Sequence, residues 1–134
     1  LQEVRKTLKR VATAIETLAE DQQKETKDQI KALTQSVEKL EMLYMMPDGL
    51  KGIQRSSDNL QSTLYSASRY ISAADGAPNQ AAQRAIAKAQ QQTQTVLERI
   101  NTFMLEDFKA FQEHIETLDF SLFKSFEPIQ LNRQ

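Results

Sequence analysis

Residues with the chemistry for catalysis or metal binding are few and scattered in this sequence. His114 is the only histidine, and there is no cysteine. Helix bundles that bind two metal ions use the pattern Glu-x-x-His, but the residue three positions before His114 is Phe111. Four positions away on either side stand Ala110 and Leu118, so no neighbour on the same helix face could share a metal with the imidazole or orient it. We therefore predict that this chain has no metal site and no catalytic histidine.

Carboxylates and hydroxyls offer no alternative catalytic centre. Glu106 and Asp107 are adjacent acidic residues of a kind that is common on solvated helix faces, whereas a glycosidase needs two carboxylates in a concave sugar site. The serine-rich stretches "QRSSDN" and "LYSAS" contain no base that would activate a hydroxyl. Because a nucleophile, a base and an orienting group cannot be named together, we predict that the chain is not an enzyme and uses no cofactor.

The stretch "MPDGLKGIQRSSDNL" gathers glycines and basic residues and is the best candidate for a phosphate site. A P-loop needs two glycines separated by four residues and then Lys-Ser/Thr, whereas Gly49 and Gly52 are three apart and no Gly-Lys pair follows. A simpler anion site stays open, since Lys51 and Arg55 precede the free amides of the next helix, although Asp58 would repel an anion there. We favour a plain connection between two helices, in which the glycines allow the bends, and predict no small-molecule ligand.

Length and composition limit the remaining functions. The 134 residues suit a single domain, residues 1–134, with one core. Acidic and basic residues nearly balance at a net charge of −1, which argues against the basic face that a nucleic-acid-binding protein needs. No apolar run approaches the roughly 20 residues of a membrane-spanning helix, and the chain begins at Leu1 without a signal peptide. We expect a C-terminal fragment of a longer protein, without a transmembrane segment.

Two apolar stripes at helical spacing occupy the first third of the chain. One comprises Leu1, Val4, Leu8, Val11, Ile15 and Leu18, and the other Ile30, Leu33, Val37, Leu40, Leu43 and Tyr44. The polar stretch "EDQQKETKDQ" separates them, and the second stripe is out of phase with the first by about 120°. Either the chain turns near residues 21–27 into an antiparallel hairpin, or one helix continues with a rotated face. The absence of glycine and proline favours one helix, and the phase slip favours the hairpin, which we prefer.

A third helix is predicted to start near Asp58, whose side chain would cap the first turn together with Gln61 in a capping-box pattern. Its predicted buried stripe is Leu60, Leu64, Ala67 and Ile71. The helix would end in "AADGAPNQ", with Gly76 in a left-handed conformation and Pro78 in the first turn of the following helix. The residues predicted to anchor the two loops beside this helix are Gly49, Gly52, Arg55, Asp58, Asp75, Gly76 and Pro78.

The fourth predicted helix runs over residues 79–118 and would be about 60 Å long. Its first half is rich in alanine, and its second half carries the large apolar residues Ile100, Phe103, Met104, Phe108, Phe111, Ile115 and Leu118. Three shorter helices cannot cover this length, so we expect the apolar tail, with Phe120, Phe123 and Phe126, to fold back over the second half. The predicted fold is an all-α, up-down four-helix bundle with a long fourth helix and a packed C-terminal tail.

Four segments of the chain carry a resemblance to a known family, and they read "GLKGIQR" (49–55), "LQSTLYSASRYI" (60–71), "DGAPNQ" (75–80) and "VLERINTFMLEDF" (96–108). Over residues 40–126 the chain resembles the C-terminal helical region of secreted bacterial sortilin-type β-propeller proteins, which are often labelled Asp-box repeat glycosyl hydrolases. In that family a Trp tends to follow the acidic residue where this chain has Phe108.

The resemblance implies a parent protein with an upstream β-propeller and a secreted, periplasmic or cell-surface location. The chain itself holds no Asp-box, because that motif ends in Trp and the sequence has none. We therefore predict a non-catalytic accessory or interaction domain that docks on the propeller or on another protein. Two alternatives stay open: the domain contributes to a glycan-binding or glycoside hydrolase function of its parent, or it is a free-standing helical adaptor.

Overall fold

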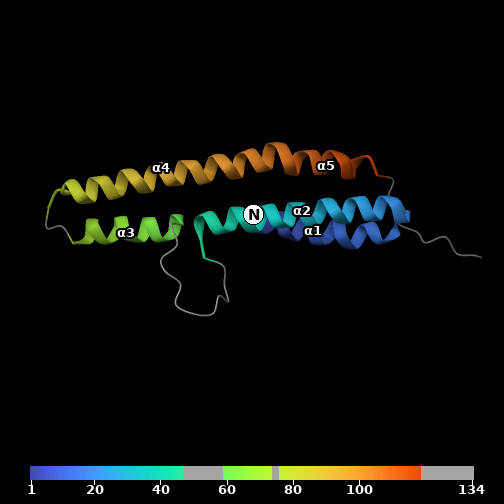
Figure 1. The fold of residues 1–134 in the computed structure, drawn as a ribbon, viewed down its shortest axis with the longest axis horizontal. Coiled ribbons are helices and arrows are strands. Elements are labelled where there is room, and N and C mark those ends of the chain that lie inside the picture. The colour runs from blue at the N-terminus through green and yellow to red at the C-terminus, as the bar shows by residue number, and fades with distance from the viewer. Residues whose placement is uncertain (47–58, 74–75, 119–134) are drawn as a thin grey trace, which may run out of the picture.

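The computed structural model describes residues 1–46, 59–73 and 76–118, and in these ranges every regular element is a helix (Figure 1). The elements in chain order are α1 (Gln2–Ala14), the 3-10 turn η1 (Ile15–Thr17), α2 (Glu20–Tyr44), α3 (Leu60–Ser72), α4 (Gln80–Phe103), the π-helical turn η2 (Met104–Phe108) and α5 (Lys109–Glu116). The predicted all-α class is confirmed. The long fourth helix is confirmed as well, because α4, η2 and α5 continue one another over residues 80–116, and we call this unit the long helix.

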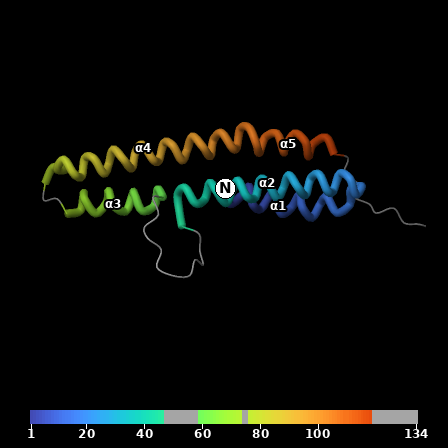
Figure 2. The backbone as a smooth tube through the Cα atoms, in the orientation of Figure 1, coloured from blue at the N-terminus to red at the C-terminus, as the bar shows by residue number. Residues whose placement is uncertain are grey.

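The first two helices form an antiparallel hairpin, which decides between the two interpretations of the N-terminal third (Figure 2). The turn lies at Leu18 and Ala19, whose backbones are both extended. The predicted turn position of 21–27 is wrong, because those residues already belong to the first turns of α2. Extended backbone is open to any residue, so this turn needs no glycine or proline. Gln23 Nε2 closes it by donating to the carbonyl oxygens of Glu16 (3.0 Å) and Leu18 (3.2 Å).

The long helix runs along the whole described part of the molecule, and the other helices lie beside it (Figures 1 and 2). The hairpin lies against its second half, and α3 runs antiparallel against its first half. Helices α2 and α3 therefore lie one after the other along the long helix. This arrangement divides the described part of the chain into two regions. We call residues 1–46 and 96–118 the three-helix end, and residues 59–73 and 76–95 the two-helix end.

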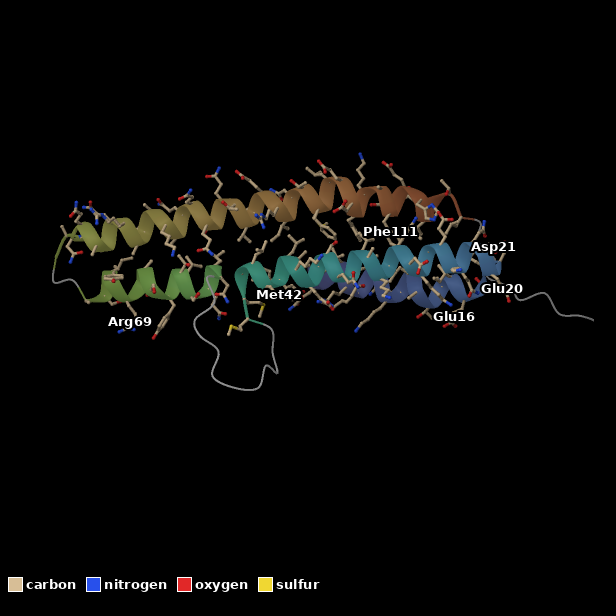
Figure 3. All side chains as sticks on the ribbon, viewed as in Figure 1. Glu16, Glu20, Asp21, Met42, Arg69 and Phe111 are labelled. Atoms are coloured by element: carbon tan, nitrogen blue, oxygen red, sulfur yellow. The ribbon has the colours of Figure 1, made fainter. Side chains whose placement is uncertain are left out.

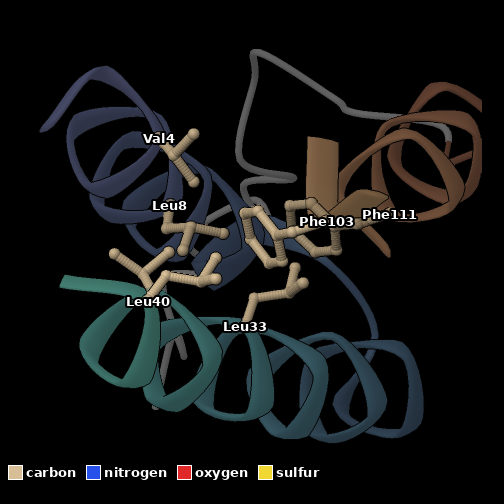
Figure 4. Close-up of a cluster of buried hydrophobic side chains, with 7 residues drawn as sticks. Val4, Leu8, Leu33, Leu40, Phe103 and Phe111 are labelled. Atoms are coloured by element: carbon tan, nitrogen blue, oxygen red, sulfur yellow. The ribbon is translucent and has the colours of Figure 1, made fainter. Parts of the chain in front are cut away.

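One hydrophobic cluster holds the three-helix end together (Figure 4). Its buried members are Val4 and Leu8 from α1, Leu33, Val37 and Leu40 from α2, and Phe103 and Phe111 from the long helix. Each large side chain buried in this way contributes about 1.5–3 kcal/mol to stability. The hairpin thus covers Phe103 and Phe111. From the sequence, we expected the C-terminal tail to cover this half of the long helix. The tail itself, residues 119–134, lies outside the described residues.

The π turn explains how two phenylalanines eight residues apart reach the same core. In an ideal α-helix, eight residues rotate a side chain about 80° past two full turns. The wider turn at Met104–Phe108 takes up an extra residue and reduces this rotation. Phe103 and Phe111 therefore both join the cluster with the hairpin, and the Phe108 ring packs against them with centroid distances of 6.4 and 6.5 Å.

Both helices of the two-helix end are capped by asparagine. Asn59 Oδ1 accepts a hydrogen bond from the Ser62 amide at 2.9 Å, and Asn79 Oδ1 accepts one from the Ala82 amide at 2.9 Å. These bonds satisfy amides that a first helical turn otherwise leaves unpaired. The predicted cap of α3, at Asp58, is therefore wrong, because the helix begins at Leu60 and Asn59 takes that role.

The buried face of α3 also differs from the prediction. Of the predicted stripe, Ala67 is fully buried, while Leu64 and Ile71 are about half exposed. The reason is that α3 packs mainly on one neighbour, the long helix, and the residues that it buries there are Thr63 and Ala67. An apolar stripe wide enough for two neighbours is therefore only partly covered.

Candidate functional site

The structure shows where the few residues with catalytic or ligand chemistry lie. His114 is partly buried on α5, and its Nε2 is buried without a hydrogen-bond partner among the described residues. Glu106 and Asp107 are exposed in the π turn. Among the described residues, no group of three or more His, Cys, Asp or Glu side chains is placed to hold a metal ion. Within the same residues we find no helix that combines the length and the hydrophobicity of a membrane span.

Two of the seven predicted loop anchors can be placed, and both lie in the turn from α3 to α4. Gly76 has a φ of +119°, on the positive side that the sequence predicts and that side chains other than glycine rarely adopt. Pro78 stands before the Asn79 cap and not in the first turn of α4, so that part of the prediction is wrong. The other anchors, Gly49, Gly52, Arg55, Asp58 and Asp75, lie outside the described residues.

A bidentate ion pair joins the two helices of the hairpin. Arg5 Nε and Nη2 donate to Oε1 and Oε2 of Glu41 at 3.0 and 2.6 Å, and Arg5 Nη1 lies 3.8 Å from Glu38 Oε1. The hydrogen bonds between the two side chains lower the pKa of Glu41 and raise the pKa of Arg5. Sequence reasoning missed this pair, since residues 36 apart meet only once the hairpin register is known. The pair is compatible with this register of the hairpin, in which Arg5 of α1 lies opposite Glu41 of α2.

Open grooves run between the helices, and they differ in charge. Two of them lie between α2 and the long helix, and their lining residues include Lys39, Glu98, Arg99 and Asp107. A third lies between α3 and α4 and is lined by apolar, amide and hydroxyl side chains, among them Leu64, Ser68, Ile71, Ile86, Gln90 and Thr93. None of the described residues that line this third groove is charged. We call it the α3–α4 groove, and it is the candidate functional site.

The α3–α4 groove combines small buried residues with larger exposed ones. Ala67 and Ala89 are both 5% exposed, and their small side chains let the two helices approach closely. Leu64 and Ile71 remain 48% and 47% exposed. Thr93 donates its hydroxyl to the Ala89 carbonyl at 2.7 Å, so this polar group is satisfied within its own helix. The groove therefore exposes apolar side chains to water, and the hydroxyl of Thr93 already donates its hydrogen bond within its own helix.

Basic residues lie near the α3–α4 groove but do not line it. The two-helix end contains Arg69, Arg84 and Lys88, and it has no carboxylate within residues 59–73 and 76–95. The side chain of Arg69 points away from the long helix (Figure 3). The lining residues that the structure describes offer no acid or base for proton transfer. What the arrangement can do is bind apolar side chains of another molecule.

Three comparisons, with models of protein families, with curated proteins and with solved structures, gave no match for this chain. The resemblance to sortilin-type β-propeller proteins therefore stays a prediction. The apolar spacing of Leu64 and Ile71 is visible in the sequence, but it predicts a core stripe and not a binding surface. The functional argument accordingly rests on the geometry of the α3–α4 groove.

Proposed function

We propose that this chain is a non-catalytic helical interaction module that binds a protein partner in the α3–α4 groove. The observation that carries the proposal is the exposure of Leu64 and Ile71 in a groove whose described lining residues are all uncharged. Fully burying a large apolar side chain contributes about 1.5–3 kcal/mol. A partner that lays the apolar stripe of a helix in the groove gains part of this contribution from both residues.

The resemblance suggests which partner to test first. Sortilin-type proteins pair their helical region with a β-propeller, so we propose such a propeller as the partner, in a secreted, periplasmic or cell-surface location. A free-standing adaptor that binds a different protein in the same groove is the alternative. Both versions need the same surface, and they differ only in what occupies it.

Calorimetric titration of the purified chain with a sortilin-type β-propeller domain tests the proposal. The double variant Leu64→Gln/Ile71→Gln should bind at least about tenfold more weakly than the wild type. Glutamine removes apolar surface but retains good helix propensity, so the variant should stay folded. Tyr70→Gln is the matched control, because Tyr70 lies on α3, is half exposed and does not line the groove. Equal binding by the wild type and the double variant would exclude the groove as the binding site.

A contribution to glycoside hydrolysis is the second candidate function, and it is tested separately. The purified chain should not hydrolyse aryl-glycosides, because Glu106 and Asp107 stand side by side on one exposed turn and not on opposite sides of a sugar site. Turnover that a single carboxylate substitution abolishes would contradict the non-catalytic assignment.

A further inference from the structure

We propose that the α3–α4 groove takes an acidic amphipathic helix from a partner protein, in which carboxylates stand beside the apolar stripe and pair with Arg69. The inference rests on the proposed function, because it uses the same groove, and it adds the chemistry of the occupant. Two observations support it. One is a face of the long helix that is covered at only one end, and the other is the single sign of the charges around the groove.

The covered end of the long helix shows why the occupant is a helix. Ile86, Thr93 and Ile100 are spaced by seven residues and therefore share one face. Ile100 packs against the core that the hairpin completes, whereas Ile86 and Thr93 line the open groove. The N-terminus of α1 lies near the middle of the molecule, so α1 does not reach over the two-helix end (Figure 1). A partner helix in the groove would continue along this face the packing that the hairpin provides.

Tyr65 and Arg69 stand along the outer edge of the groove on α3. Ser72 lines the groove, and Tyr65 and Arg69 precede it by seven and three residues, so the three share one side of the helix. Tyr65 is 66% exposed, and Arg69 is exposed and points away from the long helix (Figure 3). Tyrosine and arginine are the residues that protein interfaces favour. A helix bound in the groove would have both side chains along its flank.

Arg69 lacks the carboxylate partner that Arg5 has in the hairpin. Arg5 donates to both carboxylate oxygens of Glu41, whereas Arg69 forms no ion pair with any residue that the structure describes. A guanidinium group presents a planar fork of donors that matches a carboxylate. A partner that carries carboxylates beside its apolar stripe would therefore pair with Arg69 as Glu41 pairs with Arg5.

The charges of the two-helix end favour the same partner. Its described charged residues are Arg69, Arg84 and Lys88, and every described Asp and Glu lies at the three-helix end. Lys88 directly precedes the buried Ala89, and the lining residue Gln90 directly follows it, so Lys88 and Arg84, one turn earlier, lie on the side of α4 away from the groove. Arg69 is thus the charge beside the partner, and the other two attract an acidic segment and repel a basic one at longer range.

Two synthetic helical peptides test the inference. They share one leucine stripe, spaced i, i+3 and i+7, and carry either glutamate or lysine beside it. At low salt the full chain should bind the glutamate peptide at least about tenfold more tightly, measured by fluorescence anisotropy. The ratio should fall below about threefold at about 0.5 M salt, because salt screens exposed charges. Equal affinities at low salt, a tighter lysine peptide or no binding of either peptide would overturn the inference.

Arg69→Gln separates pairing by Arg69 from a structural role. The variant should lower the ratio of the two affinities by at least about threefold, because only the glutamate peptide loses an ion pair. Arg69→Lys should retain part of the preference, since it keeps the charge and loses the fork. Arg10→Gln is the matched control, an exposed arginine of α1, and should leave the ratio unchanged. An Arg69→Gln variant that binds both peptides equally weakly, or that keeps the wild-type ratio, would refute the pairing.

The outcomes distinguish this inference from the proposed function. If Leu64→Gln/Ile71→Gln weakens both peptides and the wild type binds them equally well, the groove remains the binding site and the acidic partner is refuted. If the double variant binds the glutamate peptide as tightly as the wild type does, the attraction lies outside the groove, which refutes both proposals. Vesicles of phosphatidylglycerol are the third probe. A chain that binds them through Arg69 and binds neither peptide would have an anionic lipid surface as its partner, which overturns the inference.

Discussion

The two ends of the molecule share the long helix but differ in the size of the side chains that they bury. At the three-helix end, Phe103 and Phe111 are 4% and 5% exposed in a cluster with residues from α1 and α2. At the two-helix end, the buried residues of α4 include Ala82 and Ala89, and those of α3 are small too. Small side chains let two helices come close, whereas large ones need a third helix to enclose them.

The two ends therefore differ in how much stability their buried side chains provide and in how much apolar surface they leave exposed. Stabilisation follows the apolar area removed from water, so alanine and threonine contribute much less than phenylalanine and leucine. The two-helix end therefore opens at a lower cost in free energy than the three-helix end. The half-exposed Leu64 and Ile71 lie at this weaker end, where binding a partner adds the area that folding leaves uncovered.

Phe103→Ala should have the largest effect and should break the three-helix end. Removing a buried phenylalanine costs about 3–5 kcal/mol. Leu64→Ala is the matched substitution at the two-helix end and should cost less than about 1 kcal/mol in dilute solution, because Leu64 is already half exposed. Urea unfolding followed by circular dichroism measures both. Similar costs at the two positions would show that the ends are equally well packed, contrary to the comparison.

Gly76→Val should lower the stability of the two-helix end by about 1–2 kcal/mol. The backbone at Gly76 has a φ of +119°, which a β-branched residue adopts poorly. Apart from the chain neighbours of Gly76, no atom of the described residues lies within 4 Å of an added Cβ, so the cost comes from the backbone and not from a clash with them. Thermal unfolding measures it, with Ala77→Val as a control at the neighbouring exposed position. An unchanged melting temperature in Gly76→Val would remove the argument.

Asn59→Ala should destabilise α3 by about 1 kcal/mol, because the amide of Ser62 loses its acceptor. The effect should be local to the two-helix end. Amide hydrogen exchange should therefore accelerate in the first turns of α3 and remain unchanged in α1 and α2. Asn59→Asp, which keeps the acceptor oxygen, is the control. Equal acceleration in the hairpin would show that the two ends unfold as one unit.

Glu41→Gln should have the smallest effect and should be confined to the three-helix end. Because the hydrogen bonds from Arg5 hold the pKa of Glu41 below 4.5, the ion pair stabilises the fold above that pH. This contribution is lost as the pH falls through the pKa of the folded state. The pair is partly exposed, so the substitution should cost at most about 1 kcal/mol at neutral pH.

Urea unfolding of the wild type and Glu41→Gln at neutral and acidic pH checks this prediction. The difference in free energy of unfolding between the two proteins should shrink as the pH falls below 4.5, the usual pKa of the carboxyl group. A difference that stays constant with pH would show that the charge of Glu41 does not stabilise the hairpin.

Local signals account for the features that the sequence predicts correctly. The stripes over residues 1–18 and 30–44 fall on the observed hairpin, and the predicted fourth helix agrees with residues 80–116 to within two residues. The errors lie where local signals are ambiguous. The turn at Leu18 and Ala19 contains no residue that favours turns, and Asp58 and Asn59 are adjacent residues that can both cap a helix.

Spacing and capping signals predict which segments are helical and where apolar residues follow one face, because both depend only on neighbours along the chain. Which of those faces is covered depends on how the helices pack. Leu64 and Ile71 are spaced by seven residues, as Leu33 and Leu40 are, yet the first pair is half exposed and the second is buried. The α2 pair lies in a core shared by three helices, whereas α3 packs mainly on one. How many helices pack against a face depends on residues far away in the chain, so the spacing of apolar residues within one helix cannot predict it.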